Sequence, residues 1–154
     1  MNFTNNLEEA EKLDNLKNKM LKYIVYKKRT EQEVRQKFQD QDEDLLEDAI
    51  EALKSAGYIN DFDYINRAIA EMTALKNISI KEMEFKLIQK GLSQNIVDDY
   101  ICKNKESMLE YELHSAKNII IKKRNSGMED ADIKNYLFKK GFMSESVSIA
   151  FDEV

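Results

Sequence analysis

The sequence predicts an all-α protein made of three tandem three-helix repeats that stack into an elongated, curved array. The 154 residues contain no proline and only four glycines, and they are rich in Lys, Glu and Leu, which favour helices. Apolar residues recur at three- and four-residue spacing, which is typical of amphipathic helices. The same order of helix starts, apolar positions and helix ends occurs three times at a period near 50 residues, which indicates stacked units.

The first unit is expected to span residues 7–57. A long amphipathic helix comes first, and Thr30-Glu31-Gln32-Glu33 then has the pattern of a capping box that starts a short second helix. A third helix begins in the acidic segment 42–44 and ends at Gly57, because the position after a helix favours a residue that tolerates positive φ. Tyr58 or Ile59 would then fold back against Leu53.

The second unit is expected at residues 58–103 and the third at 104–154. Asn60 and Asp61 would cap the first helix of the second unit, Ser79-Ile80-Lys81-Glu82 repeats the capping box, and Ser93 would cap the next helix. In the third unit Glu129 stands where the earlier units have Thr30 and Ser79. The second helices would stop at Gly91 and Gly141, and Ser144 would cap the last helix.

Apolar positions align at the same period. Phe38, Leu87 and Leu137 occupy one position, and Val34, Met83 and Ile133 lie one turn before them. Because each unit is too small to bury its own apolar face, we expect the three units to share one continuous core.

Composition restricts the class of protein. A net charge of −5 and a pI near 5.1 disfavour a protein that coats nucleic acid through bulk charge. No apolar run is long enough to cross a membrane, and the first residues lack the pattern of a signal peptide, so a cytoplasmic location is expected. The single cysteine, Cys102, cannot form an internal disulfide and is expected to be a small core residue.

The sequence offers no catalytic residues and no site for a metal or cofactor. His114 is the only histidine, and Cys102 is the only residue with which it would form a nucleophilic pair. The glycines are too widely separated for a phosphate-binding loop, and the acidic run 40–48 lacks the spacing of a calcium loop. The sequence therefore favours a binding protein over an enzyme.

Basic residues recur at the ends of the first helices and on the second helices. They are the candidate residues for contact with a partner or with DNA: Lys27, Lys28, Arg29, Lys76, Lys86, Lys90, Lys122, Lys123, Arg124, Lys139 and Lys140. Cations at helix C-termini also stabilise the helix dipole, so this pattern has a purely structural explanation as well. If the units stack regularly, the same residues would form a discontinuous basic stripe.

Several motifs resemble the RecX family of recombination regulators. Lys28-Arg29-Thr30-Glu31-Gln32-Glu33-Val34 is similar to the start of the family's second helix. Leu53, followed by Gly57-Tyr58-Ile59-Asn60-Asp61 and an aromatic residue, is similar to its junction between units. Leu87-Ile88-Gln89-Lys90-Gly91 matches the Leu-x-x-Lys-Gly of its middle unit. The resemblance extends from about Leu16 to Phe151, with Gly57, Asp61, Gly91 and Gly141 as its structural signature.

The resemblance implies a non-enzymatic protein of three three-helix repeats whose partner is the bacterial recombinase RecA. Such a protein would lie in the groove of the RecA filament on DNA and limit filament growth, ATP hydrolysis and strand exchange. Weak direct contact with DNA is a further expectation. Two alternatives remain open, a sequence-independent DNA-binding protein without a recombinase partner and a general helical-repeat adaptor.

Overall fold

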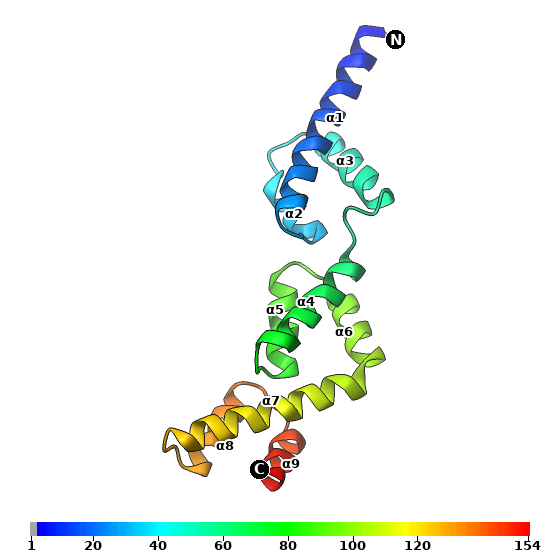
Figure 1. Cartoon of the computed structure of the whole chain (residues 1–154). Coiled ribbons are helices and arrows are strands. Elements are labelled where there is room, and N and C mark those ends of the chain that lie inside the picture. The colour runs from blue at the N-terminus through cyan, green and yellow to red at the C-terminus, as the bar shows by residue number, and fades with distance from the viewer. Residues whose placement is uncertain (1–2) are drawn as a thin grey trace. The chain divides into compact units, whose positions relative to one another are not determined.

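The computed structural model describes residues 3–154, and this part of the chain consists of nine α-helices without a β-strand (Figure 1). The all-α prediction is confirmed. The helices are α1 (Phe3–Tyr26), α2 (Glu31–Lys37), α3 (Glu43–Ser55), α4 (Asp61–Leu75), α5 (Ile80–Gln89), α6 (Gln94–Lys103), α7 (Lys105–Asn125), α8 (Asp130–Lys139) and α9 (Ser144–Glu153).

The helices form two compact units. The first unit extends to Tyr64 and includes the turn Lys90–Leu92, and the second contains Ile65–Gln89 and Ser93–Val154. The predicted division into repeats at 7–57, 58–103 and 104–154, and their stacking into one array, stay predictions.

In the first unit α1 packs against α2 and α3 (Figure 1). The buried side chains of this core are Leu16, Met20, Ile24, Val34, Ala49, Ile50, Leu53 and Ile59. The predicted turn at the end of α3 is confirmed. Gly57 has a φ of 82°, and the Tyr58 amide donates to the Leu53 carbonyl over 2.9 Å. Ile59 folds back into the core, whereas Tyr58 is half exposed, because the turn directs only one of the two inward.

In the second unit the long helix α7 contacts α5, α6, α8 and α9. A core between α7, α8 and α9 buries Ala116, Ile120, Ile133, Leu137, Phe142, Val147 and Ala150. The apolar spacing read from the sequence therefore places the correct faces inward. On α7, Leu109 and Ile121 are exceptions, since 37% and 49% of them are exposed.

The capping residues of α2 and α5 make the same pair of contacts. The Thr30 hydroxyl accepts from the Glu33 amide, Glu33 accepts from the Thr30 amide, and the Ser79 hydroxyl accepts from the Glu82 amide. Each hydroxyl also donates a hydrogen bond of 2.6 Å to a carbonyl distant in sequence. Thr30 donates to Lys90, and Ser79 donates to Lys140. Both hydroxyls are fully buried. Each cap therefore starts its own helix and also satisfies a carbonyl at the end of a later one.

The glycine after α5 and the glycine after α8 lie against the start of an earlier helix. A Cβ on Gly91 would stand 2.5 Å from the Cβ of Gln32, and one on Gly141 would stand 3.0 Å from the Cβ of Lys81. Both glycines have positive φ. The sequence predicted them as helix ends, and the structure adds that a side chain would collide at Gly91 and would be tightly packed at Gly141.

A carboxylate satisfies the first amide of α2 and of α5. Asp61 accepts from the Glu31 amide over 2.9 Å, and Glu112 accepts from the Ile80 amide over 3.1 Å. Asp61 was expected to cap its own helix, and this expectation is wrong. Asn60 accepts from the Asp63 amide instead, because it stands one residue before α4.

Three kinds of contact each occur twice, about 50 residues apart. They are the hydroxyl caps, the glycines against an earlier helix and the carboxylates on a first amide. This recurrence supports the predicted repeat.

Two further expectations are wrong. Ser144 is the first residue of α9, and Met143 occupies its N-cap position without a side-chain hydrogen bond. Cys102 is exposed rather than buried. Val97 and Ile101 are four residues apart and direct one face of α6 inward, so Cys102 is rotated about 100° away from that face.

The start of α8 is expected to open more readily than the start of α5. Glu129 makes no side-chain capping bond, whereas Ser79 does, and the loss of such a cap costs about 1 kcal/mol. Native-state hydrogen exchange should therefore show faster exchange for the first-turn amides of α8, and Glu129→Ser should slow it. Equal protection of the two helix starts would contradict this prediction.

Candidate functional site

The predicted basic residues lie on both units. Exposed members are Lys27, Lys76, Lys90, Lys122, Arg124, Lys139 and Lys140, and half-buried members are Lys28, Arg29, Lys86 and Lys123. The structure brings together some of them and pairs others with acids.

The basic cluster at the end of α1 is largely engaged within the first unit. The Lys28 ammonium lies 3.0 Å from the Asp63 carboxylate. The Arg29 guanidinium lies 4.2 Å from the centre of the Tyr23 ring and 3.9 Å from the Glu33 carboxylate. These contacts favour a packing role for Lys28 and Arg29, which leaves Lys27 as the exposed cation of this cluster.

An open groove of about 360 Å³ gathers basic and polar side chains in the second unit. Its lining residues are Asn77, Asn118, Ile119, Lys122, Lys123, Ser126 and Tyr136, and we call it the basic groove. The Lys123 ammonium lies 4.1 Å from the centre of the Tyr136 ring, and the Lys140 ammonium lies 5.7 Å from it. Two of the predicted cations therefore lie against one aromatic ring.

Hydrogen bonds hold the segment after α4 against α7 beside the basic groove. The Tyr111 hydroxyl donates 2.6 Å to the Lys76 carbonyl, and the Asn118 amide donates 3.1 Å to the Asn77 side chain. This places the backbone of Lys76 next to the groove. The side chains of Lys86, Lys90 and Lys139 are not among its lining residues.

Arg124 is held by an acid and not by the basic groove. Its guanidinium donates two hydrogen bonds of 2.9 Å to Asp130 and lies 5.4 Å from the Phe151 ring. The hydrogen bond from Arg124 lowers the pKa of Asp130. Lys122 and Lys123 thus supply the positive charge of the groove.

Sequence reasoning did not single out Tyr136, Asn118 or Asn77. Tyr136 precedes Lys139 and Lys140 on α8, so an aromatic residue within one turn of a basic pair was an available signal. Ammonium groups, amides and an aromatic ring together suit a phosphate-bearing ligand with planar bases.

An ion-pair network joins α2 to α3 in the first unit. Burial would raise the pKa of Glu31, but Lys54 and Arg35 outweigh this effect and lower it. Lys54 lies 2.9 Å from Glu31, and Arg35 contacts both Glu31 and Glu47. The hydrogen bond to Glu47 raises the pKa of Arg35 further. These acids therefore stabilise the unit rather than form a cation site.

Asp61→Asn is expected to remove a loss in the free energy of unfolding that grows as pH rises. Burial raises the pKa of Asp61 above its ordinary value of 3.8, although the Glu31 amide opposes this. The folded state then binds more protons than the unfolded state between the ordinary and the raised pKa, so stability falls as pH rises through this window. Asparagine keeps an acceptor without charge. Urea unfolding from pH 3 to pH 7 should show that the free energy of unfolding of the variant increases relative to that of the parent as pH rises.

The control for this experiment is Asp61→Ala, which loses the hydrogen bond from the Glu31 amide and should cost about 1 kcal/mol at pH 7. An asparagine variant as unstable as the alanine variant at pH 7 would contradict the prediction.

Between residues 3 and 154, no helix has the combination of length and apolar character that a membrane span requires. In the same range, no three His, Cys, Asp or Glu side chains are grouped so as to hold a metal ion.

No protein-family model matches the chain. Regulatory protein RecX of Clostridium beijerinckii is 28% identical, and the match covers 96% of this chain and 72% of that protein. The Streptococcus pneumoniae protein of the same name is 31% identical over 90% of this chain and 55% of its own length. The Staphylococcus carnosus protein is 26% identical, and the chain spans 58% of its length.

Two solved structures share the fold. RecX from Lactobacillus salivarius has a TM-score of 0.82 at 24% identity, with 94% of this chain and 97% of that chain covered. Another crystal structure, of a regulatory protein RecX, has a TM-score of 0.84 at 21% identity, with 99% and 80% covered. The sequence relatives match nearly the whole chain, and the solved structures share its fold, so the chain is similar to the RecX family of regulatory proteins over almost its full length.

Proposed function

We propose that the chain binds the RecA recombinase and its filament on DNA, and that it limits ATP hydrolysis and strand exchange in recombination and DNA repair. The observation that carries this proposal is the similarity to proteins named Regulatory protein RecX over 96% of the chain. The chain acts by binding, without catalysis of its own, in the cytoplasm where the filament forms.

The fold suits a partner that is itself repetitive. The cap, glycine and carboxylate contacts recur along the chain, and exposed cations occur in both units. Several weak contacts to successive subunits of a filament combine into tight binding, because each later contact is intramolecular. Modest local affinity is therefore sufficient for regulation.

The test of this function uses purified protein and RecA filaments on single-stranded DNA. Addition of the chain at one molecule per filament subunit should slow both ATP hydrolysis and strand exchange. Unchanged rates at this ratio would reject the proposal, and a pull-down with and without DNA would then separate a DNA-binding protein from an adaptor for another partner.

Direct contact with DNA is a second candidate function, and the basic groove favours it. Lys122 and Lys123 line this groove with the ring of Tyr136, and single-stranded nucleic acids bind to cations interleaved with aromatic rings. The chain carries a net charge of −5, so this contact would be local and secondary to the protein contact.

Lys122→Gln combined with Lys123→Gln should weaken binding to single-stranded DNA and should lower the slope of log K against log salt by about 1.4. Binding to RecA should remain largely intact. Fluorescence anisotropy at several salt concentrations measures both quantities. The matched control is Lys19→Gln with Lys22→Gln, two exposed lysines on α1. An equal loss in both double variants would show that the groove has no special role.

A further inference from the structure

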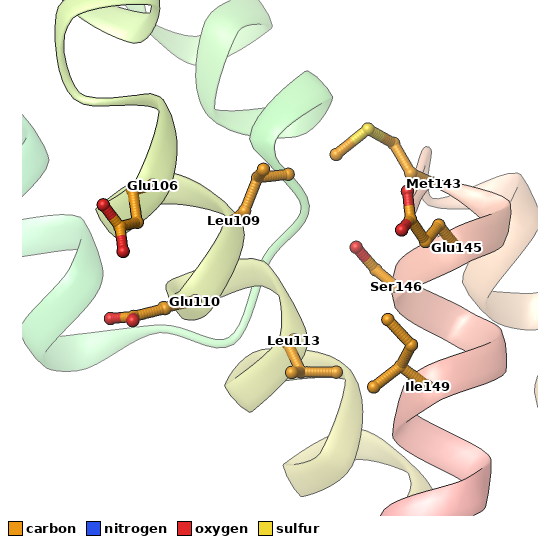
Figure 2. Close-up of a pocket in the computed structure, with 8 residues that line it drawn as sticks. All are labelled: Glu106, Leu109, Glu110, Leu113, Met143, Glu145, Ser146 and Ile149. Atoms are coloured by element: carbon orange, nitrogen blue, oxygen red, sulfur yellow. The ribbon is translucent and has the colours of Figure 1, made fainter.

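A second groove, between α7 and α9, has the opposite character to the basic groove. Its lining residues are Glu106, Leu109, Glu110, Leu113, Met143, Glu145, Ser146 and Ile149, and we call it the acidic groove. Figure 2 shows Leu109 and Leu113 directed from α7 toward Met143, the N-cap residue of α9, and toward Ser146 and Ile149 within α9. Glu106 and Glu110 lie beside the leucines on the side away from α9, and Glu145 lies next to Met143.

The apolar part of this groove is exposed to solvent. Leu109, Met143 and Ile149 are 37%, 42% and 36% exposed, although all three belong to well-formed helices or their caps. Exposed large apolar residues are ordinary when scattered singly, whereas these three line one groove together and are rimmed by polar residues.

The two walls of the groove are held rigidly. The Ser146 hydroxyl donates 2.7 Å to Glu112, whose other oxygen accepts from the Ile80 amide, and both side chains are buried. Behind them Ala116, Val147 and Ala150 pack in the core. The groove is therefore formed before any ligand arrives, so little ordering cost opposes binding.

The size and shape of the groove favour a peptide over a small molecule. Its volume of about 250 Å³ is below the roughly 300–1,000 Å³ typical of small-molecule sites. Two helices form its walls, which is the arrangement that receives one or two apolar side chains of an amphipathic segment.

The charge of the rim selects the flanks of such a segment. Glu106, Glu110 and Glu145 are all exposed, and no Lys, Arg or His is among the lining residues. Three carboxylates around an apolar floor repel an acidic segment and attract a basic one.

We propose that the acidic groove binds a partner protein through a helical segment that presents leucine-like side chains flanked by lysine or arginine. Apolar side chains of the segment occupy the space between Leu109 and Met143, and its cations pair with the glutamates of the rim. This surface is distinct from the basic groove and does not depend on the proposed recombinase partner.

The test uses a designed 18-residue peptide of leucine and lysine, with leucine at i, i+3, i+4 and i+7, and a twin in which glutamate replaces lysine. The full chain carries a methyl label on its methionines, and the peptide is titrated in 150 mM salt. We expect the methyl resonance of Met143 to shift with the lysine peptide and to remain unchanged with the glutamate peptide. Binding without a shift of Met143 would overturn the proposal.

Two variants separate the groove from the general negative charge of the chain. Glu110→Lys with Glu145→Lys should weaken binding at least tenfold, whereas Glu51→Lys with Glu71→Lys changes the net charge equally on exposed sites outside the groove and should weaken it less than threefold. Leu109→Ser should also weaken binding at least fivefold. Helix content from circular dichroism confirms that each variant is folded.

The proposal would be overturned if the two charge-reversal variants lost similar affinity for the peptide, or if Leu109→Ser bound it fully. Either result would show that non-specific charge attraction accounts for the binding. A shift of Met143 with protein concentration alone, matched by dimer formation in sedimentation velocity, would assign the groove to a second copy of the chain and would also overturn it.

Discussion

Glu112→Ala should lower the free energy of unfolding by about 3–5 kcal/mol, the largest effect expected for any single substitution here. The side chain is fully buried, and its two oxygens accept from the Ile80 amide and from the Ser146 hydroxyl. Alanine leaves both donors buried without a partner and opens a void between α5, α7 and α9. Urea unfolding followed by circular dichroism measures the loss.

Two variants on the same helix serve as controls. Glu112→Gln keeps an acceptor oxygen and nearly the same volume, so it should cost much less than alanine. Glu110→Ala removes an exposed glutamate two residues away and should change stability by no more than about 0.5 kcal/mol. If Glu112→Ala were as mild as Glu110→Ala, the hydrogen bonds of Glu112 would not stabilise the unit.

Gly91→Ala should cost about 2–4 kcal/mol, because two penalties add. The φ of 100° is unfavourable for any residue with a Cβ, and the new Cβ would stand 2.5 Å from the Cβ of Gln32. Gln32 cannot relieve this overlap by changing rotamer, since its Cβ is fixed by the backbone of α2. The backbone on one side must therefore move, which strains the hydrogen bond from Thr30 to Lys90.

Gly57→Ala is the matched control for Gly91→Ala. Gly57 also has positive φ, but a Cβ there would meet no atom within 4 Å, so only the conformational cost of about 1–2 kcal/mol applies. Gln32→Gly in the Gly91→Ala background should recover part of the difference, which a double-mutant cycle would reveal. Equal costs at Gly57 and Gly91 would contradict the proposed collision.

Much of the local structure was predictable because its causes lie within a few residues. The capping box at Thr30 and the turn at Gly57 depend on hydrogen bonds between residues three to five apart, and both are confirmed. Buried positions such as Val34, Met83 and Ile133 followed from helical spacing.

The candidate sites were less predictable because their residues come from different helices. The sequence pointed to Lys122 and Lys123, but only packing places them beside Tyr136. Leu109 lies at the edge of the acidic groove beside Met143 and Ile149, a position that only the packing of α9 against α7 determines.

By itself the sequence predicted the all-α fold, most of the points where helices start and stop, most of the buried faces, and the family that the chain resembles. The tertiary structure alone decided that Asp61 and Glu112 satisfy the first amides of other helices, that Thr30 and Ser79 reach carbonyls some 60 residues away, and that Cys102 faces solvent. The physical reason is the range of the interactions. Helix periodicity and capping act over one or two turns, whereas a buried carboxylate or hydroxyl finds its partner only once separate helices pack together.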